Sequence, residues 1–114
     1  MRFGSIVATL ILCTAACGEI DRCLDQGGRW NDMVSVCEFK LGPLTTPEDA
    51  IAAATRTLEF AYGSRVLDQR PFTAELKLGV WHVHGSLPHG VLGGVAEAWI
   101  DPDTGSVQKV VPGH

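Results

Sequence analysis

Residues 72–85, FTAELKLGVWHVHG, decide the fold because apolar and polar side chains alternate through two runs that a short turn separates. The first run is typical of a half-buried strand, and its apolar face consists of Phe72, Ala74, Leu76 and Leu78. The second run, residues 80–85, places Trp81 and Val83 on one face and His82 and His84 on the other. Together the two runs predict an antiparallel hairpin.

A two-residue turn at Leu78-Gly79 sets the register of this hairpin. Counting outward from the turn, the facing pairs are Lys77 with Val80, Leu76 with Trp81, and Glu75 with His82. We therefore expect Leu76 and Trp81 to share the core. Leucine is an unfavourable residue for the positive φ that such a turn requires.

A helix is predicted upstream, over residues 47–62. Thr46 can cap the first turn, Pro47 fits the first helical position, and the acidic pair Glu48-Asp49 faces the positive end of the helix. Gly63 is a suitable residue just beyond the end. The apolar positions recur at helical spacing and are rich in alanine, which lets a sheet approach closely: Ile51, Ala54, Leu58, Ala61 and Tyr62.

Two more strands are predicted downstream, over residues 95–101 and 106–111. Residues 87–94 form a loop before them, and the sequence DPDTG at 101–105 is a strong turn signal between them. Because Glu97 is charged, its face of the strand, with Trp99, should be the less buried one, and Ala96, Ala98 and Ile100 should pack on the helix. The prediction is an α+β domain over residues 45–114: one helix on a curved antiparallel sheet of three or four strands.

The start of the chain has the pattern of an export signal over residues 1–16. An apolar run from Phe3 to Cys13 follows Met1-Arg2 and has the length of a signal-peptide core. The small residues before Cys17 resemble the site at which bacterial lipoproteins are cut and acylated, so Cys17 is a candidate lipidation site and membrane anchor. Ordinary cleavage after Ala16 is the alternative.

Residues 17–44 are predicted to form a disulfide-tied N-terminal segment and a linker. Residues 23–39 indicate a loop-rich hairpin with a turn at Asn31-Asp32, and in an oxidising compartment Cys23 can pair with Cys37. The bridge would stabilise this segment by about 3 kcal/mol in the chain-entropy model. A metal site formed by these cysteines is disfavoured because no further ligands cluster near them.

Composition and charge exclude some classes of function. Apolar residues make up 46% of the chain and charged residues 19%, which argues against disorder. Removal of residues 1–16 would leave 8 Lys and Arg against 13 Asp and Glu, a formal net charge of −5. This acidic, unclustered balance argues against binding of nucleic acid, which requires basic patches.

Several motifs, taken in order, resemble a bacterial immunity-protein family with a nuclear transport factor 2-like fold. They are Ala50-x-x-Ala53, Tyr62-Gly63, Pro71-Phe72, Gly79-Val80-Trp81-x-Val83-x-Gly85-x-Leu87-Pro88, Gly93-Gly94-Val95-Ala96 and Asp103-x-Gly105-x-Val107. The resemblance covers about residues 46–114 and implies a cone-shaped, cystatin-like sheet wrapped on a helix. It also implies that the protein protects a cell against a polymorphic toxin.

The chain differs from this family in two respects, and a second family has a similar order of elements. The domain is short for a complete cone, so the fold is reduced or another chain completes it. An exported immunity protein protects only against a toxin that acts outside the cytoplasm. The same order of helix and sheet also resembles PepSY-type modules, whose inhibitory or regulatory binding belongs to the same class of function.

Catalytic and metal chemistry are both disfavoured by the sequence. His82 and His84 project together from one strand, with His89 nearby, but an ordinary polar strand face that includes Glu75 explains them without a metal. No serine lies in a nucleophile motif, and we expect no enzymatic activity and no cofactor. The Asp101–Asp103 stretch lacks the rest of a calcium-binding loop.

The outer face of the sheet is the candidate partner surface, formed by Glu75, His82, His84, Glu97 and Trp99. Alternatively, the disulfide hairpin or residues 41–44 cover Trp99. The sequence thus favours a non-enzymatic protein on the periplasmic side of the bacterial envelope that binds and neutralises a toxin. A structural envelope lipoprotein, or a hydrolase that uses the cavity of the cone, are the other classes.

Overall fold

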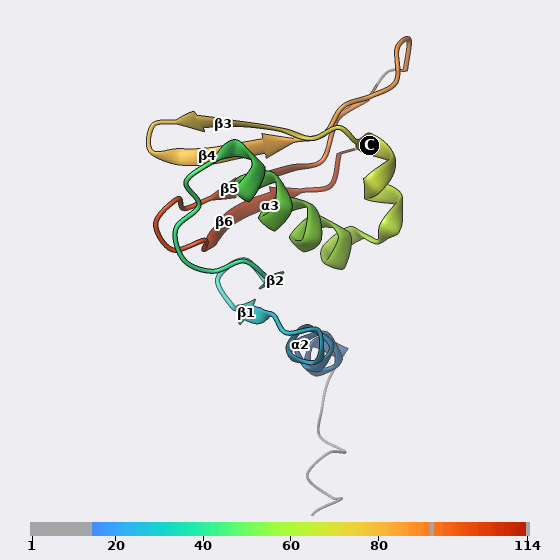
Figure 1. Ribbon diagram of the computed structural model, residues 1–114. Coiled ribbons are helices and arrows are strands. Elements are labelled where there is room, and N and C mark those ends of the chain that lie inside the picture. Colours follow the sequence, from blue (N-terminus) through green and yellow to red (C-terminus); the bar gives the residue numbers. More distant parts are fainter. Residues whose placement is uncertain (1–14, 92, 114) are drawn as a thin grey trace, which may run out of the picture.

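The computed structural model describes residues 15–91 and 93–113. The predicted apolar run of the signal segment, Phe3 to Cys13, lies outside these residues. The main body is a four-stranded antiparallel sheet in sequence order, with one long helix against one face (Figure 1). Its elements are α3 (Pro47–Tyr62), η1 (Ser64–Gln69), β3 (Thr73–Lys77), β4 (Val80–His84), β5 (Glu97–Ile100) and β6 (Val107–Val111). The α+β prediction is confirmed.

Helix α3 has the predicted bounds, because its capping signals are local. The Thr46 hydroxyl accepts a hydrogen bond from the backbone N–H of Asp49 at 3.1 Å, and Pro47 occupies the first turn. At the other end, Gly63 has φ 93° and its N–H donates to the Glu59 carbonyl at 2.8 Å. At each end of the helix, a residue directly next to it in sequence therefore forms a capping hydrogen bond.

The hairpin of β3 and β4 has the predicted register. Lys77 faces Val80, Leu76 faces Trp81, and Glu75 faces His82. The turn places both of its residues at positive φ, 52° for Leu78 and 78° for Gly79. The pairing of the two strands therefore holds a leucine in the left-handed region, where it is unfavourable by itself.

The predicted burial of Leu76 is wrong. Trp81 is 6% exposed and lies in the core, but Leu76 is 56% exposed. Burial falls from Phe72, which is buried just before β3, through the half-buried Ala74 to the exposed Leu76. The turn end of the hairpin projects beyond α3, so the edge strand has no helix to cover its last residues (Figure 1).

The core lies between α3 and the inner face of the sheet, as predicted. Ala96, just before β5, and Ala98 and Ile100 of β5 are fully buried, and they belong to one cluster with Leu58 and Ala54 of the helix. Ile51 is half-buried and packs against this cluster, whereas Ala61 and Tyr62, which the helical spacing also placed on the apolar stripe, are exposed. Small alanine side chains on both layers let helix and sheet approach closely, which explains the alanine-rich stripe.

The connector before α3, residues 39–46, completes the inner layer. Leu44 is buried, its carbonyl accepts a hydrogen bond from Trp81 Nε1 at 2.8 Å, and its N–H donates to the Pro102 carbonyl at 2.7 Å. Gly105 has φ 75°, and an added Cβ there would meet the Lys40 carbonyl. The connector and the β5–β6 turn therefore lie side by side.

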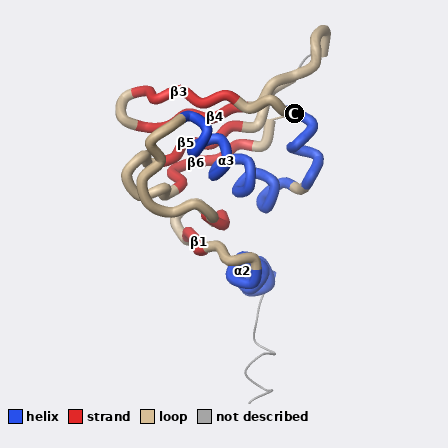
Figure 2. The backbone as a smooth tube through the Cα atoms, in the orientation of Figure 1, coloured by secondary structure: helices blue, strands red, loops and turns tan. Residues whose placement is uncertain are grey.

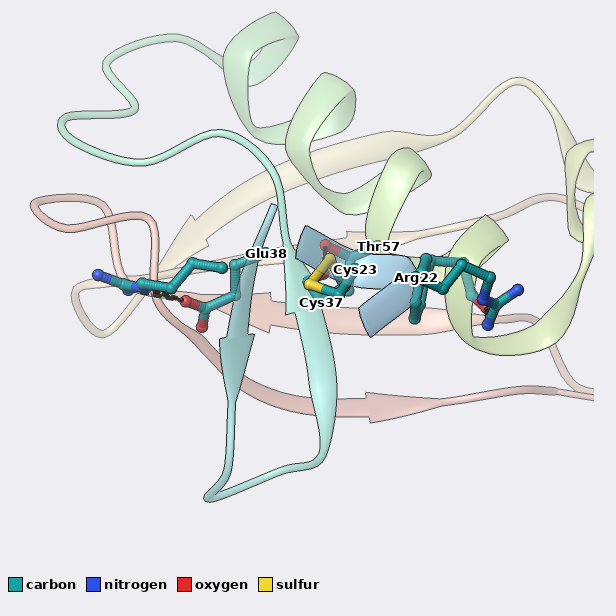
Figure 3. Close-up of a disulfide and its surroundings, with 7 residues drawn as sticks. Arg22, Cys23, Cys37, Glu38 and Thr57 are labelled. Atoms are coloured by element: carbon teal, nitrogen blue, oxygen red, sulfur yellow. Dashed lines mark hydrogen bonds and ion pairs between the residues drawn. A yellow bond between two sulfur atoms is a disulfide. The ribbon is translucent and has the colours of Figure 1, made fainter. Parts of the chain in front are cut away.

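The N-terminal segment differs in part from the predicted loop-rich hairpin. Helix α2 (Ala15–Asp25) precedes a short hairpin of β1 (Arg29–Asn31) and β2 (Val36–Glu38), so Cys23 lies on a helix. The predicted Cys23–Cys37 disulfide is confirmed, with 5.5 Å between the two Cα atoms (Figure 3). Thr57 Oγ1 of α3 donates to the Cys37 carbonyl at 2.8 Å, which attaches the bridge to the main body.

The downstream strands are shorter than predicted. β5 begins at Glu97 instead of Val95, and β6 begins at Val107. An irregularity between Trp99 and Ile100 shifts the β5–β6 register. The connection from β4 to β5 extends away from the sheet instead of lying on a face (Figure 2).

Candidate functional site

The outer face of the sheet, opposite α3, brings most of the predicted partner residues together. His82 of β4 faces Trp99 of β5, and His84 faces Glu97. On the far side, Trp99 also faces Lys109 of β6. These five side chains point to the same side because facing residues of antiparallel strands share a face. We call this set the outer patch.

Trp99 is the centre of the outer patch and is half-buried. The imidazole of His82 stacks on its ring with 4.7 Å between centroids and 14° between planes. From the other side, Lys109 Nζ lies 5.0 Å from the ring centroid, at cation–π distance. The indole therefore lies between a histidine of β4 and a lysine of β6.

Hydrogen bonds orient both histidines of the outer patch. His82 Nε2 lies 2.7 Å from Glu97 Oε1, and their side chains are 18% and 31% exposed. His84 Nε2 lies 3.0 Å from the hydroxyl of Thr73, and its Nδ1 is 3.1 Å from the Gly85 carbonyl. The patch thus presents both signs of charge around an aromatic ring, and a hydrogen bond orients the histidine that stacks on this ring.

Glu75, the remaining predicted partner residue, forms an ion pair outside the outer patch. It faces His82 in the register, but its carboxylate pairs with Lys77 two residues along β3, at 3.2 Å. Both side chains of this pair are more than half exposed, at 57% and 58%. His82 pairs with Glu97 instead, because the two side chains reach each other diagonally across β4 and β5. The predicted facing of Glu75 and His82 is therefore confirmed, but the carboxylate that bonds to the His82 ring is that of Glu97.

The two elements expected as alternative covers for Trp99 lie elsewhere. Residues 41–44 run on the inner side, where Leu44 bonds to Trp81. The disulfide hairpin meets the sheet at its β6 edge through Asn31 Nδ2, which donates to the Val107 carbonyl at 3.0 Å. Among the described residues, the aromatic and cation–π contacts of the Trp99 ring are those with His82 and Lys109.

One buried carboxylate was missed by the sequence analysis. Glu38 is 1% exposed, and its Oε1 accepts two hydrogen bonds from Arg29, at 2.7 and 3.0 Å. Its Oε2 accepts from Asn31 Nδ2 at 2.6 Å and from the N–H of Val107 at 2.7 Å. The sequence did contain a signal for this ion pair, because Arg29 and Glu38 lie on either side of the Asn31-Asp32 turn and face each other in the hairpin. The contacts attach the hairpin to β6, which makes Glu38 a structural residue.

The described residues offer little for metal or membrane chemistry. Within residues 15–91 and 93–113, no three His, Cys, Asp or Glu side chains gather closely enough to hold a metal ion. His89 is exposed on the β4–β5 connection. In the same part of the chain, no helix has the length and hydropathy needed to cross a membrane. Cys17 falls within α2, and its lipidation stays a prediction.

One comparison with known proteins agrees with the fold and with the motifs. A family model described as NTF2 fold immunity protein matches residues 49–114, which is more than half of the 114-residue chain. The match spans nearly all of α3 and the whole four-stranded sheet. No curated protein and no solved structure matches the chain. The chain belongs to the NTF2 fold immunity protein family, and the resemblance inferred from its motifs is confirmed.

Proposed function

We propose that this protein neutralises a protein toxin by binding it on the outer patch, without catalysis. The family supports the class of function, and the arrangement around Trp99 supports the location. Binding energy at protein interfaces is concentrated in aromatic and charged anchors that are already ordered before binding. Trp99, which stacks on His82 and has Lys109 Nζ at cation–π distance, has the side-chain type and the contacts of such an anchor.

The single observation that carries the location is the stacked, half-buried indole among charges of both signs. A side chain needed only for folding would point toward α3, where the core lies. Trp99 instead points to the opposite face, next to the His82–Glu97 pair. A toxin surface with an apolar pocket rimmed by polar groups would match this arrangement.

We place this activity outside the cytoplasm, on the periplasmic side of the envelope. The support is the export pattern of residues 1–16 and the Cys23–Cys37 disulfide, since disulfides persist in oxidising compartments. A lipid on Cys17 would hold the protein at the membrane, near a toxin that arrives there. Metabolic labelling with a fatty-acid probe tests this: label is expected in the wild type and lost in Cys17→Ser, and label that persists in the variant contradicts the anchor.

The docking proposal is tested with a toxin domain that a pull-down from the native host, with this protein as bait, identifies. Titration calorimetry of the two proteins should show a tight complex with the wild type. Trp99→Ala should weaken binding by about 30-fold or more, which corresponds to an interface anchor worth at least about 2 kcal/mol. Met33→Ala is the matched control, because Met33 is a large apolar side chain that is 92% exposed on the β1–β2 turn.

Growth assays give the functional counterpart of this measurement. Cells that export the toxin domain should survive with the wild type or Met33→Ala and die with Trp99→Ala. A Trp99→Ala protein that folds, binds and protects as well as the wild type would refute the outer patch as the docking site. A wild type that gives no protection would refute the toxin-neutralising function itself.

A further inference from the structure

The two edges of the sheet differ in whether another segment covers them. At the β6 edge, the N–H and carbonyl of Val107 are bonded to Glu38 and Asn31 of the disulfide hairpin. At the other edge lies β3, and no described element runs along its outer side (Figure 1). An uncovered edge strand presents unpaired N–H and carbonyl groups that can bond to another strand.

The register shows which groups of β3 are unpaired. In a hairpin with a two-residue turn, the residues that flank the turn form a hydrogen-bonded pair, here Lys77 with Val80. The alternate residues, Thr73 and Glu75, then also bond toward β4. Ala74 and Leu76 direct their backbone groups toward the free edge. Leu76 is also 56% exposed, so the centre of this edge is apolar as well as unpaired.

The charges on β3 are arranged symmetrically about Leu76. Glu75 and Lys77 lie one residue to either side and point to the same face, and each is more than half exposed. When two copies of β3 pair antiparallel with the two-fold axis at Leu76, Glu75 of each copy faces Lys77 of the other. These facing residues form a non-hydrogen-bonded pair, the type in which side chains approach most closely. On the opposite face, Leu76 meets Leu76 of the second copy.

We propose that β3 is a self-association edge, at which two copies of this chain join their sheets into one continuous antiparallel sheet. An edge lysine normally discourages pairing, because an unrelated strand offers no matching acid. A second copy offers that acid in the right register, at both ends of a self-complementary contact. The pairing goes beyond toxin neutralisation, and Trp99, two strands away from β3, stays accessible in the dimer.

Charge reversal tests the register directly. The full chain is purified in mild detergent and studied by sedimentation velocity, in which the wild type should be a dimer that weakens with added salt. Glu75→Lys and Lys77→Glu each place like charges opposite each other at two sites, so each should associate at least about 10-fold more weakly. A mixture of the two single variants should dimerise again, because the lysines at both positions of one variant then face the glutamates at both positions of the other.

The double variant Glu75→Lys with Lys77→Glu should also restore the dimer, since it exchanges the partners without changing the composition. Circular dichroism checks that each variant is folded. Leu76→Glu is an additional test that spares the core, because this side chain is already mostly exposed, and it should give a monomer. A wild type that stays monomeric up to about 0.5 mM, where weak contacts are occupied, overturns the proposal. Single reversals that leave the dimer intact, or folded variants that do not dimerise when mixed, also overturn it.

Discussion

The two faces of the four-stranded sheet have opposite environments, although the same strands form both. On the inner face, Trp81, Ala98 and Ile100 are buried against α3 and have no free polar group, since the Trp81 N–H bonds to the Leu44 carbonyl. On the outer face, Trp99 stays half-buried among histidine, lysine and glutamate side chains. The period of two thus divides each strand between residues that stabilise the fold and residues that are available to a partner.

The largest expected loss of stability comes from a substitution on the inner face. Trp81→Ala should lower the free energy of unfolding by about 3–5 kcal/mol, because it leaves a cavity and an unpaired Leu44 carbonyl. Trp99→Ala is the matched variant on the other face and should cost about 1 kcal/mol, since it loses only partly exposed contacts. Urea denaturation monitored by circular dichroism measures both. Equal losses from the two tryptophans would show that the faces do not differ in this way.

The disulfide comes next in expected size. Replacing Cys23 and Cys37 together by serine should lower stability by about 3 kcal/mol, since the bridge closes a short loop in the unfolded chain. The bridge lies away from the outer patch, so the affinity for the toxin domain of the protein that remains folded should not change. Denaturation and calorimetry of the double variant check these two expectations, and a stability equal to that of the wild type would contradict the first.

Glu38 tests how the hairpin is attached to the sheet. Glu38→Ala should cost about 2 kcal/mol, because Val107 N–H and Asn31 lose a buried acceptor. Glu38→Gln keeps one acceptor oxygen and should cost less than the alanine variant. The order of the two unfolding free energies is the measurement, and a glutamine variant less stable than the alanine variant would contradict the assigned role.

The helix cap has the smallest expected effect. Thr46→Ala removes the hydroxyl that accepts from Asp49 N–H and should cost about 1 kcal/mol. Thr46→Asp keeps an N-cap acceptor and should retain most of the stability. Thermal unfolding compares the two variants, and equal losses would show that the hydrogen bond contributes little.

Local signals explain the parts of the fold that the sequence predicted. The bounds of α3 depend on Thr46, Pro47 and Gly63, all adjacent to its ends. The β3–β4 register depends on a turn of two residues and the alternation on either side of it. Most of the outer patch followed from the same alternation, once Glu97 marked the more exposed face of β5.

Longer-range packing explains what the sequence did not predict. Leu76 has the periodicity of a core residue, but α3 does not reach the end of β3. Helix α2 is short, so its stability as an isolated helix would be marginal. It is held to the rest of the chain by the Cys23–Cys37 disulfide and by Arg22, whose Cζ lies 4.0 Å from the Phe60 ring centroid. Lys109 joins the outer patch through the irregular β5–β6 register, which no local pattern indicated.

The most direct test of the outer patch is site-specific photo-crosslinking in the complex with the toxin domain. A photo-reactive amino acid in place of Lys109 would sit beside Trp99, and one in place of Glu48 would sit exposed on α3, on the other side of the sheet. We predict crosslinks to the toxin from position 109 and none from position 48. Crosslinks from position 48 alone would place the toxin on the helical side and contradict the docking site.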